Sequence, residues 1–330
     1  MAPTRWGIVA AGSISNDFVD CLNNLPQDEH QVVAVAGRNF DNAKKFAQLH
    51  RIRKVYSSYE EIAADPDVEV AYVGSLHPDH FPTMKMLLAN GKHILCEKPL
   101  TMNRRDTEDI CRMAKEKKLF LMEALWSRYL PTYIHMEELL KKGTIGEVRY
   151  VHSTFGYPME HQPRMFIKEL GGSVLLTLGN YCVNLVLQVF GGERPVKISA
   201  CGDLSPQGTD QGVAVSMEFS GGRLATFALS GVVKLPGVAE IFGRKGKITL
   251  YPPFHAPTCV ESPAGKFEIQ LPAPSVPLNF PNASGLRYEA EEVRRCLREG
   301  LLESPKMTHH DSLLIAEIFD EILKQIGVQF

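Results

Sequence analysis

Short hydrophobic runs alternate with amphipathic stretches over residues 1–125. The amphipathic stretches at 14–25, 41–49, 79–90 and 104–117 predict helices, and the runs predict strands at 6–11, 31–36, 68–74, 93–96 and 119–122. Ser58-Tyr-Glu-Glu61 is a capping box that begins one more short helix. Strands that alternate with helices at this spacing predict a parallel, doubly wound sheet of the Rossmann type.

The pattern changes after residue 126. A helix is predicted over 129–142, and a final helical pair over 288–299 and 312–326. Between them, a period of two predicts strands at 147–155, 196–202, 213–219, 223–229, 247–251 and 266–271. Ser220-Gly221-Gly222 is typical of a hairpin turn. We therefore predict an α/β protein: an N-terminal Rossmann domain over 1–125, and an α+β domain with a large, mainly antiparallel open sheet over 126–330.

Composition restricts the partners of the chain. Its 330 residues carry a net charge of −2 and no long Lys/Arg run, which argues against nucleic acid and anionic membrane surfaces and favours a small-molecule substrate. Seven scattered cysteines without a C-x-x-C pair indicate reduced thiols and predict a cytoplasmic location. No uninterrupted apolar run reaches about 18 residues, so no membrane span is predicted, and residues 174–190 are expected to form a buried helix.

A nucleotide-binding turn is predicted where the first strand ends. Ala10, Gly12 and Ser15 occupy the three positions of an imperfect G-x-G-x-x-G pattern, and Ser13 and Ile14 begin the helix. Small residues there let the backbone approach a pyrophosphate, and the N–H groups at the helix start meet its charge. The alternative is an ordinary tight strand-to-helix turn.

The end of the second strand discriminates between the two nicotinamide cofactors. An acidic residue there would hold the ribose 2′-hydroxyl of NAD, whereas this chain has Arg38 and Asn39. A guanidinium and an amide are suited to a 2′-phosphate, so we expect NADP(H). The alternative is an NAD site beside a solvated arginine.

Glu97-Lys98-Pro99 follows the strand at 93–96. This tripeptide after a Rossmann strand resembles the signature of the Gfo/Idh/MocA oxidoreductases, and the rest of the chain is similar to their dihydrodiol dehydrogenase branch. The stretches that carry this second resemblance span nearly the whole length: 5–9, 29–36, 58–61, 95–99, 120–124, 181–183 and 303–305.

The resemblance implies roles for individual residues. Lys98 and a residue on the helix after a Gly-Gly pair, here Gly171-Gly172, would handle the proton. The family pattern has Asp and, four residues later, His or Tyr on that helix, where this chain has Thr177 and Tyr181. A tyrosine has a reference pKa of about 10, and the ammonium of Lys98 would favour its phenolate form. Thr177 retains the helix face but not the charge, so we expect an active enzyme that is slower or has a shifted pH optimum.

Further candidates line the expected crevice. Glu97 and His77 are candidate cofactor contacts, with His77 expected near the nicotinamide ribose. Trp126 and Arg128 match a Trp-x-Arg stretch of the family; they either wall the substrate pocket or pack at the domain boundary. Arg164 is either a substrate contact or structural. His77 and His80 lack further ligands at metal-binding spacing, so no metal is expected.

These observations predict an NADP-dependent dehydrogenase that acts on a vicinal diol or a sugar hydroxyl. The resemblance implies oxidation of trans-dihydrodiols to catechols, oxidation of D-xylose to its lactone, or reduction of dicarbonyls, and it implies a homodimer. The alternative is a cofactor-binding paralogue with impaired turnover, because Thr177 replaces the family Asp. A short-chain dehydrogenase is disfavoured, since none of the ten tyrosines is followed four residues later by lysine.

Overall fold

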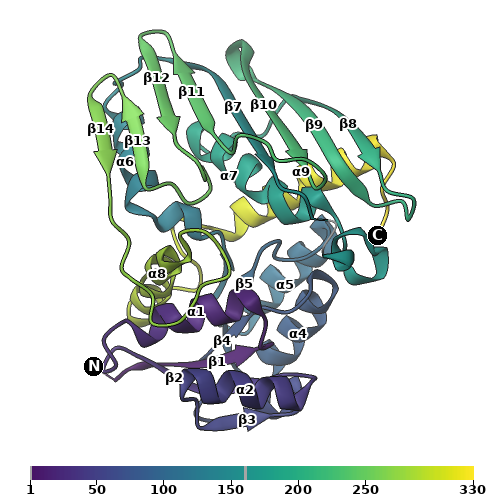
Figure 1. Ribbon diagram of the computed structural model, residues 1–330, viewed down its shortest axis with the longest axis vertical. Helices are drawn as coiled ribbons and strands as arrows, with labels where there is room; N and C mark the ends of the chain where they lie inside the picture. Colours follow the sequence, from purple (N-terminus) through teal and green to yellow (C-terminus); the bar gives the residue numbers. More distant parts are fainter. Residues whose placement is uncertain (1, 160–161) are drawn as a thin grey trace. The chain divides into compact units, whose positions relative to one another are not determined.

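The computed structural model describes residues 2–159 and 162–330, which form two compact units (Figure 1). The first unit comprises the chain up to Thr101, Arg105–Trp126 and Leu271–Ser312. The second comprises Met102–Arg104, Ser127–Gln270 and Leu313–Phe330. This division by contacts differs from a single cut between residues 125 and 126, because a stretch near the C-terminus that contains α8 (Arg287–Arg298) packs within the first unit.

The first unit contains the predicted parallel sheet. Its six strands follow the order β3-β2-β1-β4-β5-β6, and every neighbouring pair is parallel. The strands are β1 (Thr4–Val9), β2 (His30–Ala36), β3 (Lys54–Tyr56), β4 (Val70–Val73), β5 (His93–Glu97) and β6 (Leu121–Ala124). The helices are α1 (Ser13–Asn23), α2 (Phe40–His50), α3 (Tyr59–Ala64), α4 (His77–Ala89) and α5 (Arg104–Glu116). The Rossmann prediction is confirmed.

Local signals explain most of these elements. β1, β4 and β5 are almost wholly buried, as expected for parallel strands covered on both faces. The predicted capping box of α3 is present, with Ser58 and Glu61 bonded reciprocally. The sequence missed β3, because three half-buried residues are too few to show a periodic pattern.

The C-terminal stretch of the first unit is anchored to α1 by two buried carboxylates. Asp17 accepts hydrogen bonds of 2.9 Å from the backbone N–H groups of Asn279 and Phe280. Asp20 accepts bonds of 3.0 and 3.1 Å from the N–H groups of Ser275 and Val276. Acidic side chains on α1 thus satisfy the backbone of a loop more than 250 residues further along the chain.

The second unit contains an eight-stranded sheet in the order β14-β13-β12-β11-β7-β10-β9-β8. Only β7 and β10 pair in parallel; the other neighbours are antiparallel. The strands are β7 (Val148–Gly156), β8 (Lys197–Leu204), β9 (Asp210–Phe219), β10 (Arg223–Ser230), β11 (Ala239–Gly243), β12 (Gly246–Leu250), β13 (Cys259–Ser262) and β14 (Gly265–Glu268). The mainly antiparallel sheet and the hairpin between β9 and β10 are confirmed, whereas β11 and β13 were missed.

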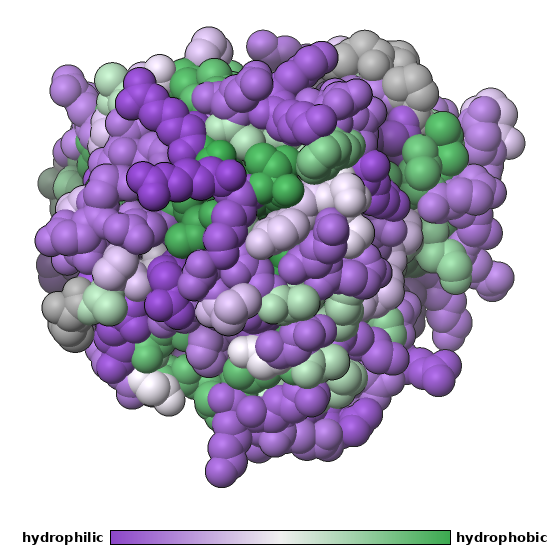
Figure 2. Space-filling view, turned by 90° about the horizontal axis from the view of Figure 1, so that it is seen from below, coloured by the Kyte–Doolittle hydropathy of each residue, from purple (hydrophilic) through white to green (hydrophobic). Residues whose placement is uncertain are grey.

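Helices α6 (Pro131–Lys141) and α7 (Asn180–Val189) belong to the second unit, and α9 (His309–Ile326) extends into it. One helical segment, Lys168–Val189, has the length and hydropathy of a membrane span, but 89% of its most apolar window is buried inside the protein. Figure 2 shows a face on which hydrophilic side chains predominate and hydrophobic ones form smaller groups.

Replacing Asp17 tests the anchor between α1 and the C-terminal stretch. Asp17→Ala leaves the N–H groups of Asn279 and Phe280 without their acceptor, so the free energy of unfolding should fall by about 2–3 kcal/mol. Urea denaturation followed by circular dichroism measures this change. Asp41→Ala is the matched control, because the Asp41 side chain on α2 is 84% exposed; equal effects of the two substitutions would contradict the anchor.

Candidate active site

The turn between β1 and α1 has the features of a phosphate cradle. Ala10 adopts a left-handed backbone conformation (φ 76°), which glycine would adopt more easily and which costs alanine about 1 kcal/mol. Gly12 is the exposed N-cap of α1; no side chain caps the helix, and its first turn carries no acidic residue. These are the features that a pyrophosphate needs at a helix start, and its binding by the N–H groups of Ser13 and Ile14 stays a prediction.

Ser15, at the third fingerprint position, packs against a glycine that directly follows the neighbouring strand β4. Ser15 is fully buried, and a Cβ added to Gly74 would lie 2.4 Å from the Ser15 hydroxyl oxygen. Gly74, which directly follows β4, thus gives α1 the close approach to the sheet that the third fingerprint glycine provides in other Rossmann folds.

Arg38 follows β2 and forms an ion pair that the sequence did not predict. Its guanidinium lies 2.9 Å from an Asp79 carboxylate oxygen on α4 and 5.9 Å from the ring centre of Tyr59. The Arg38 side chain is 62% exposed. Asn39 is the N-cap of α2, and its Oδ1 accepts the Asn42 N–H at 3.0 Å. The side-chain oxygen of Asn39 therefore has a structural role, and the side-chain NH₂ group is the donor for a phosphate.

The two histidines after β4 differ in their surroundings. His77 is the first residue of α4 and is partly buried. His80 is fully buried, with Nδ1 2.8 Å from the Pro99 carbonyl oxygen and Nε2 3.1 Å from the Ser75 carbonyl oxygen. Because both His80 nitrogens face carbonyl oxygens, His80 is not arranged to bind a metal together with His77.

Glu97, the residue before Lys98, interacts with two further buried ionisable groups, Tyr72 and Glu289. Glu97 accepts a 2.7 Å hydrogen bond from the Tyr72 hydroxyl and a 3.3 Å bond from the Lys98 backbone N–H. Glu289 on α8 is fully buried, and neither of its carboxyl oxygens has a hydrogen-bond partner among the described residues. Burial raises the pKa of Glu97, although the charge of Lys98 opposes the shift. Burial and the nearby Glu97 also raise the pKa of Glu289.

This arrangement gives Glu97 an interior role. Both of its carboxyl oxygens bind groups of the protein itself, and the contact with the cofactor that the sequence predicts stays a prediction. Lys98, the next residue, is only partly buried.

The helix that carries Thr177 and Tyr181 begins with an irregular turn. Leu175–Gly179 is π-helical and continues directly into α7. Such turns are rare and occur frequently at functional sites. The buried Asp210 of β9 accepts the Leu175 N–H at 2.6 Å and so binds the helix start to the sheet.

The Gly171-Gly172 pair before this helix has a steric explanation. Gly171 has a positive φ of 71°, which favours glycine. A Cβ on Gly172 would lie 2.7 Å from the carbonyl oxygen of Arg164. Both glycines are therefore needed to bring the chain past residues 164–165 into the helix.

Tyr181 lies in an aromatic cluster within the second unit. Its ring centre lies 4.8 Å from that of His255 and 5.8 Å from that of Phe155, and the rings of Phe155 and His255 stack at 4.6 Å. Tyr181 is only 7% exposed. The hydroxyl of Thr177 points to the Met165 sulfur at 3.8 Å.

The remaining predicted substrate residues have different environments. Arg128 is buried, and its Nε donates a 2.5 Å hydrogen bond to Asn184 on α7. Asn184 in turn donates to Gln188, which donates to Glu137. Arg128 thus belongs to a packed polar network on the helix that carries Tyr181. Trp126 is buried, whereas Arg164 is exposed.

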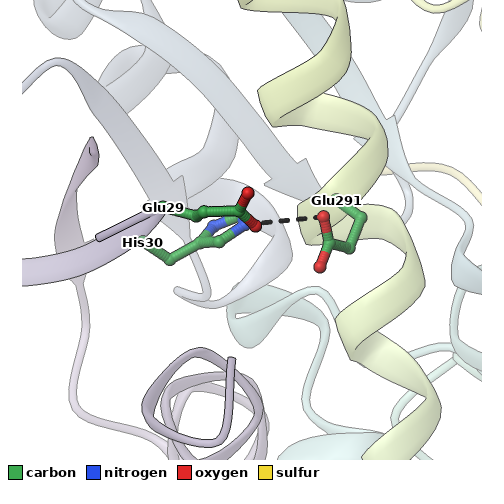
Figure 3. A group of neighbouring side chains, drawn as sticks. All are labelled: Glu29, His30 and Glu291. Carbon is green, nitrogen blue, oxygen red and sulfur yellow. Dashed lines mark ion pairs between the residues drawn. The ribbon is translucent and has the colours of Figure 1, made fainter. Parts of the chain in front are cut away.

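One group of side chains has the composition of a metal site. Glu29, His30 and Glu291 present ligand atoms within 4.8 Å of one another, from the start of β2 and from α8 (Figure 3). The Trp6 indole donates a 3.2 Å hydrogen bond to His30 Nδ1, which is therefore the unprotonated nitrogen. Nε2 then carries the proton and faces Glu291 at 3.7 Å. This tautomer offers no lone pair to a metal between His30 and Glu291.

Comparisons with known proteins agree with this geometry. Residues 4–125 match a family model described as oxidoreductase family, NAD-binding Rossmann fold, and residues 133–249 match the GFO/IDH/MocA C-terminal domain. The chain is 45% identical over 327 residues to the trans-1,2-dihydrobenzene-1,2-diol dehydrogenase of Xenopus tropicalis, with 99% of both chains covered. It is 42% identical over 326 residues to the Homo sapiens enzyme of the same name, with 99% of this chain and 98% of that protein covered. The chain belongs to the GFO/IDH/MocA oxidoreductase family.

Solved structures share the fold over nearly the whole chain. KijD10, a 3-ketoreductase from Actinomadura kijaniata in complex with NADP and TDP-benzene, superposes with a TM-score of 0.84 at 22% identity, covering 98% of each chain. Levoglucosan dehydrogenase in complex with NADH and levoglucosan gives a TM-score of 0.86 at 18% identity, covering 98% of this chain and 97% of that one. The two-part GFO/IDH/MocA fold is thereby confirmed.

The predicted site residues of this GFO/IDH/MocA member divide between the two units. The cofactor candidates and Lys98 follow the carboxyl ends of strands in the first unit, and Thr177 and Tyr181 belong to the second. Their cooperation as an acid–base pair remains a prediction.

The sequence analysis missed three notable residues. Asp79 stood in the His-Pro-Asp-His stretch, and Glu289 stood on the same face of a predicted helix as Val293 and Cys296, so both left a signal. His255 left none, because it lies in a proline-rich loop.

The buried Glu289 predicts a distinctive pH dependence of stability. Because its pKa is raised in the folded state, the folded protein retains a proton that the unfolded chain loses, so stability should fall as the pH rises above the ordinary pKa of glutamate. Glu289→Gln keeps the shape without the ionisation. Relative to the wild type, this variant should gain about 1–3 kcal/mol between pH 5 and pH 8.

Urea denaturation at the two pH values measures this difference. Glu60→Gln, at an exposed position on α3, is the control and should follow the wild type. Parallel behaviour of Glu289→Gln and the wild type would show that Glu289 is ionised in the folded protein.

Proposed function

We propose that the chain is an NADP-dependent dehydrogenase that transfers hydride between the nicotinamide and a vicinal diol or sugar hydroxyl. The observation that carries the proposal is the 42–45% identity, over 99% of the chain, to trans-1,2-dihydrobenzene-1,2-diol dehydrogenases. The candidate reactions are oxidation of a trans-dihydrodiol to a catechol, oxidation of D-xylose to its lactone, and reduction of a dicarbonyl. The homodimer and the cytoplasmic location belong to the same proposal.

The residues of the first unit have assigned roles in binding NADP(H). The Ala10–Gly12 turn and the N–H groups of Ser13 and Ile14 would hold the pyrophosphate. Arg38 and Asn39 would hold the 2′-phosphate, and His77 would lie near the nicotinamide ribose. When bound, the oxidised nicotinamide accepts a hydride from the carbon that carries the substrate hydroxyl.

The proton of that hydroxyl is assigned to Tyr181. Tyr181 would accept it as a base during oxidation and return it during reduction. Lys98 would stabilise the phenolate form of Tyr181 and exchange the proton with solvent. Trp126, Arg128 and Arg164 are the candidate substrate-pocket residues, with Arg128 acting through Asn184 and the helix rather than from an exposed position.

A second candidate function is a cofactor-binding paralogue with impaired turnover. The observation that favours it is Thr177, whose hydroxyl faces a methionine sulfur where the family pattern has a carboxylate. The family carboxylate would supply the lysine with a charge that Thr177 does not supply.

Activity can be tested by NADPH formation at 340 nm from NADP⁺ with D-xylose and with a trans-dihydrodiol. The wild type should turn over, and Lys98→Met should lose at least about 100-fold in kcat, because general acid–base groups contribute on that order. Lys115→Met, at an exposed position on α5, should behave as the wild type.

Other outcomes of this assay separate the two candidate functions. Intact cofactor binding without turnover would support the impaired paralogue, and recovery of activity in Thr177→Asp would identify the missing carboxylate as its cause. Full activity in Lys98→Met would contradict the role of Lys98.

The cofactor preference depends on Arg38. Arg38→Ala removes a charge-assisted donor, worth about 1.5–3 kcal/mol, so the Kd for NADP⁺ should rise by about 10- to 100-fold while the Kd for NAD⁺ changes little. Fluorescence titration with both cofactors measures the ratio, and Arg53→Ala, an exposed arginine before β3, is the control. An unchanged ratio in Arg38→Ala would favour an NAD site with a solvated arginine.

A further inference from the structure

His255 contacts the side chain proposed as the catalytic base. Its ring centre lies 4.8 Å from that of Tyr181, with the two planes tilted by 41°. This separation is a direct contact between the two rings, and it places the imidazole beside the phenol that the proposed chemistry uses. His255 is 6% exposed, so its contact with Tyr181 lies inside the second unit.

The position of His255 is fixed by the protein on both sides. The Ser127 hydroxyl donates to the His255 carbonyl oxygen. The Tyr133 hydroxyl donates to the Phe254 carbonyl oxygen at 3.0 Å, and the Thr132 hydroxyl donates to the Pro257 carbonyl oxygen at 2.8 Å. The loop at 254–257 is therefore held by three side chains from the segment that begins α6.

The ring of His255 is oriented as firmly as its backbone. Phe155 of β7 stacks on the imidazole at 4.6 Å with an interplanar angle of 23°, and Phe254 meets it edge-on at 6.3 Å. Two apolar rings and one phenol thus surround an imidazole. Packing of this kind holds a side chain in one orientation, as a proton-handling group requires.

The other titratable groups of this region do not change charge near neutral pH. Burial raises the pKa of Tyr133, and burial raises the pKa of Cys182 to about 12. Arg128 is bonded to Asn184, and a guanidinium group does not lose its proton in proteins. Thr177, one turn before Tyr181, is not ionisable. Imidazole is the side chain of this cluster whose unperturbed pKa, about 6.5, allows it to gain and lose a proton under physiological conditions.

We propose that His255 is a positioning residue for Tyr181 and acts as a proton relay. Thr177, which stands where the family pattern has Asp, has no carboxylate that could do so. The inference rests on the proposed dehydrogenase function. In the oxidative direction, the Tyr181 hydroxyl gives its proton to the His255 imidazole and becomes a phenolate. The phenolate takes the substrate hydroxyl proton while the adjacent C–H bond delivers its hydrogen and both electrons to the nicotinamide. The imidazolium then releases its proton to water, by a route in addition to the one assigned to Lys98, and the overall reaction balances: alcohol and NADP⁺ give carbonyl, NADPH and H⁺.

The first test is the pH profile of kcat/KM in His255→Phe, which keeps an aromatic ring in the stack but removes the ionisation. At pH 7 the variant should lose about 10-fold or more in kcat/KM, and one ionisation should disappear from its profile. His135→Phe is the matched control, because His135 of α6 also stacks on a phenylalanine, Phe267, at 4.2 Å. The control should keep the wild-type profile. A His255→Phe profile that superposes on the wild type would overturn the proposal.

The second test does not require turnover, and it distinguishes failure of this proposal from failure of the proposed function. The imidazole signal of His255, identified in a ¹³C–¹H NMR spectrum by its absence in His255→Phe, is titrated in the wild type and in Tyr181→Phe. Coupling between the two groups should move the midpoint by about half a pH unit or more when the hydroxyl is removed. An identical midpoint in both proteins would overturn the relay even if the wild type is an active dehydrogenase, and a shifted midpoint would support it even if the substrates tried give no NADPH.

Discussion

The first unit depends on the reversal of strand order at β1. This strand pairs in parallel with β2 on one side and with β4 on the other, so the chain leaves the two halves of the sheet in opposite directions. A crevice must then open where the strands end. Ala10, Arg38, His77 and Lys98 are all placed shortly after the carboxyl end of a strand, which is why residues scattered over nearly 90 positions form one candidate nucleotide site. The close packing of Ser15 against Gly74 holds the first turn of α1 against the carboxyl end of β4.

The interior of the first unit departs from the usual separation of polar and apolar groups. Tyr72, Glu97 and Glu289 place two carboxyl groups and a phenol in surroundings that oppose their ionisation. Buried charge of this kind is unfavourable unless it is neutralised or paired. It lies next to the residue assigned to catalysis, and departures from the ordinary rules of packing concentrate at functional sites. The cluster around His30, by contrast, is structural. Glu29, His30 and Glu291 have the composition of a metal site, but the Trp6 indole donates a hydrogen bond to His30 Nδ1 and so occupies that nitrogen.

The elements that the sequence predicted well have strong local signals. The buried strands of the Rossmann sheet, the Ser58 capping box and the β9–β10 hairpin all follow from patterns within a few residues. Strand β3 was missed because three residues are too few to show a periodic pattern, whereas β11 and β13 were missed although strands of similar length, such as β12 and β14, were predicted. The return of Leu271–Ser312 to the first unit depends on hydrogen bonds between Asp17 and Asn279, which no local pattern reveals. For the candidate site, motif positions located Lys98, Thr177 and Tyr181, whereas the interior role of the Glu97 carboxylate and the contact between His255 and Tyr181 arise only from tertiary packing.

The π-helical turn at Leu175–Gly179 determines how the helix responds to a change in its length. A π-turn contains one residue more than an α-helical turn, so it sets the rotational phase of everything that follows. The wide turn absorbs this additional residue, so Tyr181 faces Phe155 and His255 in nearly the orientation that a regular helix one residue shorter would give it. A one-residue deletion within the π-turn should therefore be tolerated better than one in a regular α-helical turn, where it would rotate the side chains that follow by about 100°.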